Sequence, residues 1–365
     1  MLTDLTKISP IGLVTGTGFK QIGRKQDQEL IYILQKASDL GISLIDTAEI
    51  YFDGHAEKLI GKAFKNNREK VFIATKFSPE HSNYKGVLRA AEGSLNRLNT
   101  DYIDLYQIHW PNPSVPIEDT LKALEKLKKD GKVRNIGVCN FSLRQLKDIQ
   151  KKTKLPIISL QNEYNLLERS IELDLLPYCE KNNITTIAYA PLNSGNILQN
   201  KKYSKVLSKL SKKYKRSISQ IILNFLTSHP SVVVIPATIN ITHLEENARS
   251  TEFILEKKDI QLIAETSASK LINIDTSKIK VASLDNHAAY KTVEEALANK
   301  LNFFPSPKML SEDIKKGDFL KPVKVRVLKK KEAIFEYELL GGRIRFWAWI
   351  IANKGEKPIP AIIED

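Results

Sequence analysis

Short apolar stretches alternate with longer amphipathic ones from residue 11 to about residue 270. The short stretches are β-branched and almost wholly apolar, which is typical of strands buried on both faces of a parallel sheet. In the longer ones leucine and isoleucine recur at helical spacing, as in residues 28–41, where Gly41 marks the helix end. The strands predicted in this way are residues 11–15, 43–47, 71–75, 104–108, 135–139, 157–161, 185–189 and 232–236.

Eight strand–helix units within roughly 250 residues are the content of a closed (β/α)8 barrel. A doubly wound open sheet is the structural alternative, and it normally carries a glycine-rich dinucleotide turn after its first strand. Gly16, Thr17 and Gly18 follow the first strand here, but the full GxGxxG spacing is absent. The pattern therefore predicts an α/β protein with a (β/α)8 TIM barrel over residues 1–270.

The pattern changes after residue 270. Residues 271–277 are polar and weakly patterned, and they are predicted to be a linker. A small α+β domain is predicted over residues 278–365, within the size range of a separate domain. Its predicted elements are a strand at 279–284, a helix at 292–301, a short helix capped by Ser311, a hairpin of strands 321–328 and 333–340 that turns at Lys329–Lys331, a helix within 341–355 and a strand at 358–364.

The composition is that of an ordinary globular protein, with 42% hydrophobic and 27% charged residues. No apolar run is long enough to span a bilayer, and the first ten residues contain no apolar signal core. Cys139 and Cys179 are not in a paired metal or redox spacing, so neither a disulfide framework nor a metal site is expected. These features favour a cytoplasmic protein that does not bind membranes.

The formal net charge of +14 would suit nucleic acid or phosphorylated ligands. The charge is spread along the chain, however. Residues 271–365 contain 17 Lys and Arg against 13 Asp and Glu, a net of +4, and the first 270 residues carry the remaining +10. We interpret the excess as solvated, lysine-rich helix faces, so nucleic acid is not expected as a partner.

Four polar residues lie at or just after the carboxyl ends of predicted strands, where barrels place their catalytic groups. Asp46 ends the second strand, Tyr51 lies in the following loop, Lys76 ends the third strand and His109 ends the fourth. Each alone has an ordinary structural explanation, such as a helix cap or a core histidine. All four at equivalent positions are harder to explain by packing, since charged groups are seldom buried without partners.

This set of side chains suits the reduction of a carbonyl group, which needs a hydride at carbon and a proton at oxygen. A tyrosine hydroxyl can give the proton, although its ordinary pKa of about 10 makes it a poor donor at neutral pH. A neighbouring lysine ammonium lowers that pKa, and an aspartate would hold the lysine in place. A neutral histidine can hydrogen-bond the carbonyl oxygen.

Three sequence blocks around these residues, 44–51, 74–77 and 101–111, resemble the signature blocks of the aldo-keto reductase family. The resemblance extends over residues 8–265 and implies a catalytic tetrad of Asp46, Tyr51, Lys76 and His109. Tyr51 would be the acid/base, and Trp110 would line the substrate pocket or pack at the barrel rim. The implied cofactor contacts are Thr17, Asp46, Cys139, Asn140, Gln161, Tyr189, Ala190, Pro191, Leu192, Ser194, Thr238, His243, Glu246 and Asn247.

Within this set, Asn140 and Gln161 would hold the nicotinamide carboxamide, and Tyr189 would stack on the nicotinamide ring. Many family members carry a lysine and an arginine where this chain has Ala237 and His243. Two cations that would pair with the ribose 2′-phosphate are therefore missing. The resemblance to the family still favours NADP(H) over NAD(H) as the cofactor. The resemblance implies an NAD(P)H-dependent reductase that acts on a small-molecule aldehyde or ketone.

Residues 279–364 resemble the ParB/sulfiredoxin-type fold, in which a glycine-led helix start binds a nucleotide phosphate. Gly341, Gly342, Arg343 and Arg345 would form a phosphate site here, or serve only as a helix start with basic caps. Arg343 stands where sulfiredoxins have their reactive cysteine, so sulfiredoxin chemistry is not expected. ParB proteins read DNA through a helix-turn-helix domain that follows this fold, and this chain ends at Asp365. A second hypothesis is a nicotinamide-nucleotide sensor that signals through this domain.

Overall fold

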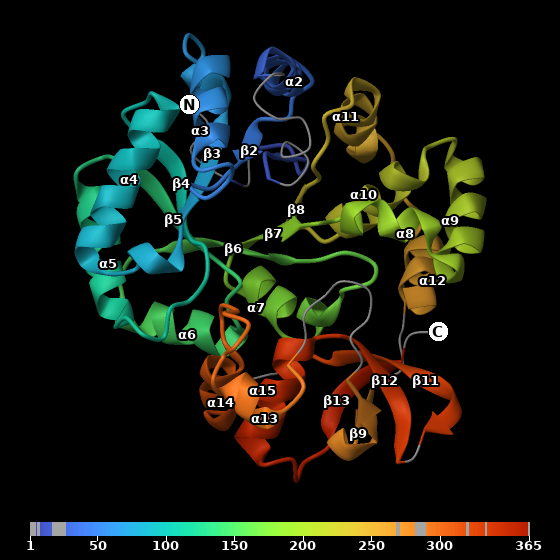
Figure 1. The fold of residues 1–365 in the computed structure, drawn as a ribbon. Coiled ribbons are helices and arrows are strands. Elements are labelled where there is room, and N and C mark those ends of the chain that lie inside the picture. Colours follow the sequence, from blue (N-terminus) through green and yellow to red (C-terminus); the bar gives the residue numbers. More distant parts are fainter. Residues whose placement is uncertain are drawn as a thin grey trace. The chain divides into compact units, whose positions relative to one another are not determined.

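The computed structural model describes residues 5, 8–16, 27–267, 271–281, 290–318, 321–332 and 334–363. The chain divides into two compact units (Figure 1). The barrel unit comprises Met1–Phe141 and Gln145–Ser267, and the C-terminal unit comprises Ser142–Arg144 and Ala268–Asp365. No helix in the described ranges is long and apolar enough to cross a membrane.

The barrel unit contains eight parallel strands, each paired with the next along the chain. Ile11 forms a bridge with Val234, and the Gly12 amide donates to the Val234 carbonyl at 2.8 Å, so the last strand returns to the first. This closure confirms the predicted (β/α)8 barrel and excludes the open sheet. The strands are β1 (Leu13–Val14), β2 (Leu44–Asp46), β3 (Phe72–Phe77), β4 (Ile103–Ile108), β5 (Val133–Cys139), β6 (Ile157–Glu163), β7 (Thr185–Tyr189) and β8 (Val232–Ile235).

The helices of this unit lie around the outside of the strands (Figure 1). Each buries one apolar stripe, as α2 does with Leu30, Ile33, Leu34 and Ala37, and Gly41 ends that segment at a φ of 82°. The helices are α2 (Asp27–Asp39), α3 (His55–Ala63), α4 (Tyr84–Leu98), α5 (Ile117–Lys129), α6 (Leu143–Lys152), α7 (Leu175–Lys181), α8 (Asn196–Gln199), α9 (Lys201–Tyr214), α10 (Ile218–Thr227), α11 (Ile241–Ala248) and α12 (Lys257–Ser267).

The barrel interior contains an apolar cluster and, nearer the carboxyl ends of the strands, a group of buried polar side chains. Leu44, Phe72, Leu105, Ile187 and Ile235 form one buried cluster. Further along the same strands or the neighbouring ones, the buried side chains become polar, at Asp46, Lys76, Gln107, His109 and Gln161. Barrels of this kind have a packed apolar interior and place their functional groups at the carboxyl ends of the strands.

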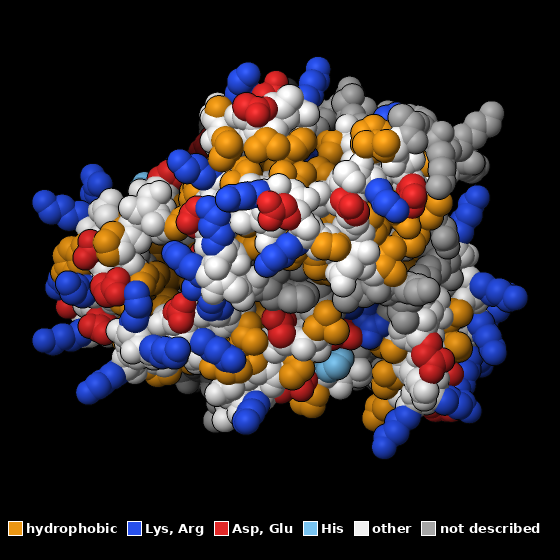
Figure 2. Space-filling view, turned by 90° about the horizontal axis from the view of Figure 1, so that it is seen from below, with side chains coloured by type: hydrophobic (Ala, Val, Ile, Leu, Met, Phe, Trp, Pro, Cys, Tyr) orange, Lys and Arg blue, Asp and Glu red, His pale blue; other side chains and the backbone are white. Residues whose placement is uncertain are grey.

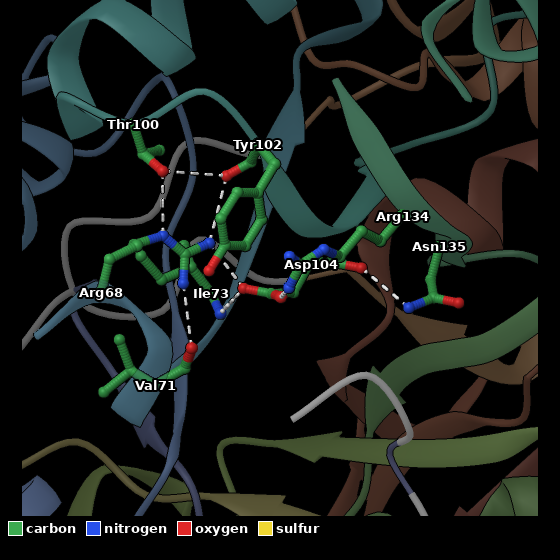
Figure 3. A network of polar contacts seen from close by, with 8 residues as sticks. All are labelled: Arg68, Val71, Ile73, Thr100, Tyr102, Asp104, Arg134 and Asn135. Carbon is green, nitrogen blue, oxygen red and sulfur yellow. Dashed lines mark hydrogen bonds and ion pairs between the residues drawn. The ribbon is translucent and has the colours of Figure 1, made fainter. Parts of the chain in front are cut away.

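A second polar cluster lies near the amino ends of β3, β4 and β5, and it centres on Asp104 (Figure 3). The buried Asp104 carboxylate accepts hydrogen bonds from Arg68 Nη2 at 2.5 Å, Arg134 Nη1 at 2.9 Å and the Ile73 amide at 3.0 Å. Both guanidinium groups also lie over the Tyr102 ring, at 4.2 and 3.4 Å from its centre. The position of this polar cluster at the amino ends of the strands indicates that it contributes to stability.

We expect Asp104→Asn to lower the free energy of unfolding by about 3 kcal/mol, because it leaves two partly buried arginines without their carboxylate. Urea unfolding followed by circular dichroism measures this change. Asp101→Asn is the matched control, because Asp101 is exposed three residues earlier. Equal stability of the two variants would show that the Asp104 cluster contributes nothing.

The C-terminal unit contains a five-stranded mixed sheet in the order β10-β12-β11-β13-β9. Its core includes Tyr290, Val325, Leu339 and Ile359, together with Phe346 and Trp347 from the longest helix, α15. The strands are β9 (Leu271–Ile274), β10 (Ile279–Lys280), β11 (Val323–Glu332), β12 (Phe335–Gly341) and β13 (Ile359–Ile363), and the helices are α13 (Val293–Leu297), α14 (Pro307–Lys315) and α15 (Arg343–Asn353).

Several boundaries predicted for this unit are wrong. Residues 271–277 are not a linker, because β9 pairs antiparallel with β13 and Ile272 and Ile274 pack on the core. The residues that alternate with these two isoleucines are polar, so the segment resembles a linker in the sequence alone. The helix α14 is capped by Ser306 and not by Ser311, and Pro307 takes its first helical position. Lys329–Lys331 do not turn the hairpin, because β11 continues through them to Glu332. The predicted strand 279–284 is described only to residue 281.

Lys and Arg side chains are spread over the face shown in Figure 2, among acidic and apolar ones. Several exposed charges of the protein are paired, such as Lys126 with Asp130 at 2.8 Å and Lys315 with Glu312 at 2.8 Å. This distribution agrees with the interpretation of the basic excess as solvated helix faces.

Candidate active site

The four residues of the predicted tetrad lie together at the carboxyl end of the barrel strands. Asp46 is the last residue of β2, Lys76 lies near the end of β3, and His109 directly follows β4. Tyr51 lies in the β2–α3 loop. Because the strands are parallel, these ends meet at one mouth of the barrel.

Asp46 and Lys76 form an ion pair that is fully buried, with Nζ and Oδ1 2.6 Å apart. Lys76 Nζ also donates to the Thr47 carbonyl at 2.8 Å, and Gln161 Nε2 donates to Asp46 Oδ2 at 2.8 Å. Burial alone would lower the pKa of Lys76, but Asp46 and Tyr51 raise it above its ordinary value. Burial raises the pKa of Asp46, and Lys76 opposes that rise. The lysine is therefore held charged.

The Tyr51 ring lies near both this ion pair and His109. Lys76 Nζ is 5.3 Å from the centre of the Tyr51 ring, and the His109 ring meets it edge-on with centres 6.1 Å apart. A Cβ added to Gly16, two residues after β1, would lie 3.5 Å from the tyrosine ring, so the chain after β1 passes close to it. Burial raises the pKa of Tyr51 and outweighs Lys76, which lowers it. The lowering expected from lysine is present, but burial is the larger effect.

The loop that carries Tyr51 has an unusual backbone and a buried anchor. Phe52, Asp53 and Gly54 all have positive φ values, of 53°, 54° and 77°. Just beyond them the buried Glu57 accepts hydrogen bonds from Thr75 Oγ1 at 2.7 Å and from Arg97 Nε at 2.6 Å. Since Thr75 precedes Lys76 on β3, this anchor fixes the loop relative to the strand that carries the lysine.

His109 is buried and neutral. Burial, with a contribution from Lys76, lowers the pKa of His109 to about 2. Its Nδ1 has no hydrogen-bond partner within the described part of the chain. The Trp110 indole stacks on the imidazole, with ring centres 3.6 Å apart. Trp110 thus covers one face of the histidine.

The residues expected around a nicotinamide are hydrogen-bonded to one another. Asn140, at a φ of 62°, donates from Nδ2 to the His109 carbonyl at 3.0 Å and to Cys139 Sγ at 3.2 Å, and its Oδ1 accepts from Tyr189 Oη at 3.0 Å. Gln161 donates to Asp46 through Nε2. Cys139 and Cys179 are free and buried, and burial raises the pKa of Cys139 to about 12.

The residues expected along the rest of a dinucleotide lie after β7 and β8. Ala190, Asn193 and Ser194 all have positive φ values, and Pro191 and Leu192 lie between them. After β8, the buried Thr238 accepts a hydrogen bond from the Asn240 amide at 3.1 Å. His243 and Glu246 lie on α11, as does the buried Asn247. Thr17 lies outside the described residues.

Three functional candidates were not predicted from the sequence. Asn240 caps α11, and its side chain accepts from the His243 amide at 3.1 Å. Gln107 and Ser159 are buried inside the barrel, two residues before His109 and Gln161. A period-two reading of β4 and β6 would have found both, because residues two apart on a strand share a face.

In the C-terminal unit the predicted phosphate site is divided between two elements. Gly341 is the last residue of β12, and Gly342 caps α15 at a φ of 84°. Arg343 and Arg345 lie in the first turn of α15, and Arg345 Nη1 donates to the Pro322 carbonyl at 3.2 Å. Arg345 therefore already bonds within its own unit.

Residues 11–268 match the Aldo/keto reductase family. The chain is 36% identical over 253 residues to methylglyoxal reductase YeaE of Escherichia coli (strain K12), which covers 68% of this chain and 88% of that protein. It is 38% identical over 226 residues to glyoxal reductase of Bacillus subtilis (strain 168), over 61% of this chain and 78% of that protein.

The barrel is also similar to solved structures. An aldo-keto reductase from Klebsiella pneumoniae, crystallised in complex with NADPH, superposes with a TM-score of 0.67 at 31% identity, over 71% of this chain and 90% of that chain. Because the matched residues span most of this chain and coincide with its barrel, the chain belongs to the aldo/keto reductase family and is an NAD(P)H-dependent oxidoreductase that reduces carbonyl groups.

Proposed function

We propose that Tyr51 gives the proton in this reduction. The observation that carries the proposal is the buried Asp46–Lys76 pair beside the Tyr51 ring. The Tyr51 hydroxyl protonates the carbonyl oxygen, and the Lys76 ammonium stabilises the phenolate that remains. Neutral His109 donates a hydrogen bond to the same oxygen and orients the carbonyl. Asp46 holds Lys76 charged, and solvent then returns a proton to Tyr51.

We also propose the residues that bind the cofactor, which supplies the hydride when bound. Tyr189 offers an aromatic face, and Asn140 and Gln161 offer amides beside it. The loop of Ala190, Pro191, Leu192 and Ser194 includes left-handed residues at Ala190 and Ser194, a backbone conformation that recurs in anion-binding loops, and it would follow the pyrophosphate. Thr238, His243, Glu246 and Asn247 would contact the adenosine end. The donor set fits NADP(H) or NAD(H), and we favour NADP(H), with which the Klebsiella relative was crystallised.

The substrates we propose are small 2-oxoaldehydes such as methylglyoxal. Two relatives are named for reducing methylglyoxal and glyoxal. The side chains next to Tyr51 and His109 in sequence, Ile50 and Trp110, are apolar and partly exposed. An apolar rim favours small uncharged carbonyl compounds over charged ones. A reductase is favoured over a nucleotide sensor, because the four side chains proposed for the tetrad lie near one another at one mouth of the barrel.

Oxidation of NADPH and NADH, followed at 340 nm with methylglyoxal, tests the function. The full chain should consume both cofactors in proportion to the aldehyde reduced, with a lower Kd for NADPH. Cofactor binding without turnover of methylglyoxal, glyoxal or simple aldehydes would favour the sensor instead.

His243→Arg should lower the Kd for NADPH about tenfold, because the arginine would pair with the 2′-phosphate, and it should leave the Kd for NADH unchanged. Equal changes for both cofactors would contradict the proposed position of the adenosine end.

For the C-terminal unit we propose a ParB/sulfiredoxin-type module. The order of the β11–β12 hairpin, the Gly342-led helix α15 and the final strand β13 supports this assignment. We assign no nucleotide or phosphate ligand to it, since Arg345 bonds to the Pro322 carbonyl and a helix start alone does not make a site.

A further inference from the structure

Glu49 lies where the chain leaves β2 and turns toward Tyr51. The Glu49 amide donates to the Lys76 carbonyl at 3.1 Å, which continues the parallel pairing of β2 with β3. If that pairing went one step further, the Ser78 amide would donate to the backbone carbonyl of Glu49. It donates instead to the Glu49 side chain, with the amide nitrogen 2.6 Å from Oε1. The carboxylate thus extends the contact with the β3 segment beyond the point where the backbone turns away.

The backbone that follows Glu49 depends on contacts of this kind. Phe52 and Asp53 have φ values of 53° and 54°, in the left-handed region that residues other than glycine seldom adopt. Such conformations persist where the surrounding structure fixes them. Beyond them, the buried Glu57 accepts a hydrogen bond from a threonine hydroxyl of β3 at 2.7 Å. Glu49 and Glu57 therefore tie both ends of this segment to β3, and Tyr51 lies between them in the sequence.

The turn of residues 78–81, to which Glu49 is bonded, has two further polar contacts. His81 Nδ1 lies 2.8 Å from the same Glu49 Oε1 atom, and the Glu49 side chain is mostly buried whereas that of His81 is partly exposed. Asn112 Nδ2 donates to the Pro79 carbonyl at 2.8 Å, and Asn112 belongs to the β4–α5 loop, three residues after His109. The turn is thus bonded to both neighbouring loops, each of which carries a residue of the tetrad.

We propose that Glu49 is a positioning residue that holds Tyr51 near Lys76. Its carboxylate fixes the start of the Tyr51 segment to the turn of residues 78–81, two residues beyond the lysine. With Glu57 fixing the other end, the segment keeps the Tyr51 ring at 5.3 Å from Lys76 Nζ. The inference rests on the proton-donor role proposed above for Tyr51. Glu49 acts through Tyr51 and takes no part in the proton transfer itself.

The first test is Glu49→Ala, which removes the carboxylate and leaves the backbone bond to Lys76 in place. We expect kcat for methylglyoxal to fall about tenfold, because a misplacement of about 1 Å is enough for such a loss. The KM for methylglyoxal and the Kd for NADPH should change less than about twofold, since only the position of the proton donor is altered. Glu80→Ala is the matched control, because it removes an exposed carboxylate from the same turn and should keep wild-type kcat.

Glu49→Gln is the conservative variant. Its amide oxygen can accept the same hydrogen bond from the Ser78 amide, so kcat should stay within about threefold of wild type. Hydrogen exchange of the full chain gives a readout that does not depend on activity. The Ser78 amide should lose protection in Glu49→Ala and keep it in Glu49→Gln.

A second background separates positioning of the tyrosine from a general loss of structure. If Glu49 acts through Tyr51, Glu49→Ala should cause no further loss in the residual rate of Tyr51→Phe, measured in single turnovers at high enzyme concentration. A change that disturbs the whole site would lower the rate by the same factor in both backgrounds.

Wild-type kcat in Glu49→Ala would overturn the inference, and so would equal losses in Glu49→Ala and Glu80→Ala. A Glu49→Gln variant as slow as Glu49→Ala would also overturn it, because the bond to Ser78 would then not carry the effect. The same holds for a full loss in the Tyr51→Phe background. None of these results touches the proposed function, which an active Tyr51→Phe would overturn instead.

Discussion

Tyr51→Phe should lower kcat for aldehyde reduction by about a thousandfold and leave the Kd for NADPH within twofold of wild type. The phenyl ring keeps the contacts with His109 and with Gly16, so the shape of the site is retained. Only the proton donor is lost, and positioned general acids contribute roughly 10²–10⁴-fold to rate. Steady-state kinetics, with cofactor binding measured by fluorescence quenching, separates the two quantities.

Tyr106→Phe is the matched control for that variant. Tyr106 is also a fully buried tyrosine, and its hydroxyl has no partner in the described ranges. It lies on β4, next in sequence to Gln107, where its neighbours are Glu49, Glu57 and Arg97 rather than the tetrad. We expect wild-type activity from it. Retained turnover in Tyr51→Phe, or equal losses in both variants, would remove the role assigned to Tyr51.

The barrel could be predicted from the sequence because each of its strands is a separate apolar run. A strand buried on both faces needs no partner to be recognised, and the helices between them carry regular apolar stripes. Gly41 ended its helix as predicted, since a left-handed residue after a helix is a local requirement. Each of the eight predicted strands overlaps an observed one, and the differences lie at the strand ends.

The C-terminal unit was harder because its strands are buried on one face only. Ile272 and Ile274 alternate with Asn273 and Asp275, so the sequence of β9 resembles a polar linker, and only its pairing with β13 makes it a strand. The lysines at the end of β11 are strand residues because Glu332 pairs with Phe335, and that register depends on the partner strand. Such choices are set by tertiary contacts, which a single sequence does not contain.

The strand-end residues of the candidate site were predictable, and their partners were not. Asp46, Lys76 and His109 follow from the rule that barrels place functional groups at strand ends. The hydrogen bonds from Gln161 to Asp46 and from Tyr189 to Asn140 join segments that are far apart in the sequence. The net rise of the Tyr51 pKa also depends on burial, which the sequence does not report.

Lys76→Met should reduce kcat by about a hundredfold or more and move the alkaline limb of the activity profile to higher pH. In the wild type Lys76 lowers the pKa of Tyr51, so its removal lets that pKa rise further. Tyr51 then stays protonated to higher pH, yet it becomes a weaker donor because nothing stabilises its phenolate. The pH dependence of kcat, measured from pH 6 to 11, checks the direction of this shift.

The same substitution leaves Asp46 buried without its cation, which should cost about 3 kcal/mol of stability. Asp46→Asn/Lys76→Met separates the two effects. The double variant removes both charges and keeps an acceptor for Gln161, so its stability should return close to wild type. Its activity should not return, because the phenolate still lacks the ammonium. If the double variant regained turnover, the loss in Lys76→Met would come from an unpaired carboxylate alone, and Lys76 would have no part in activating Tyr51.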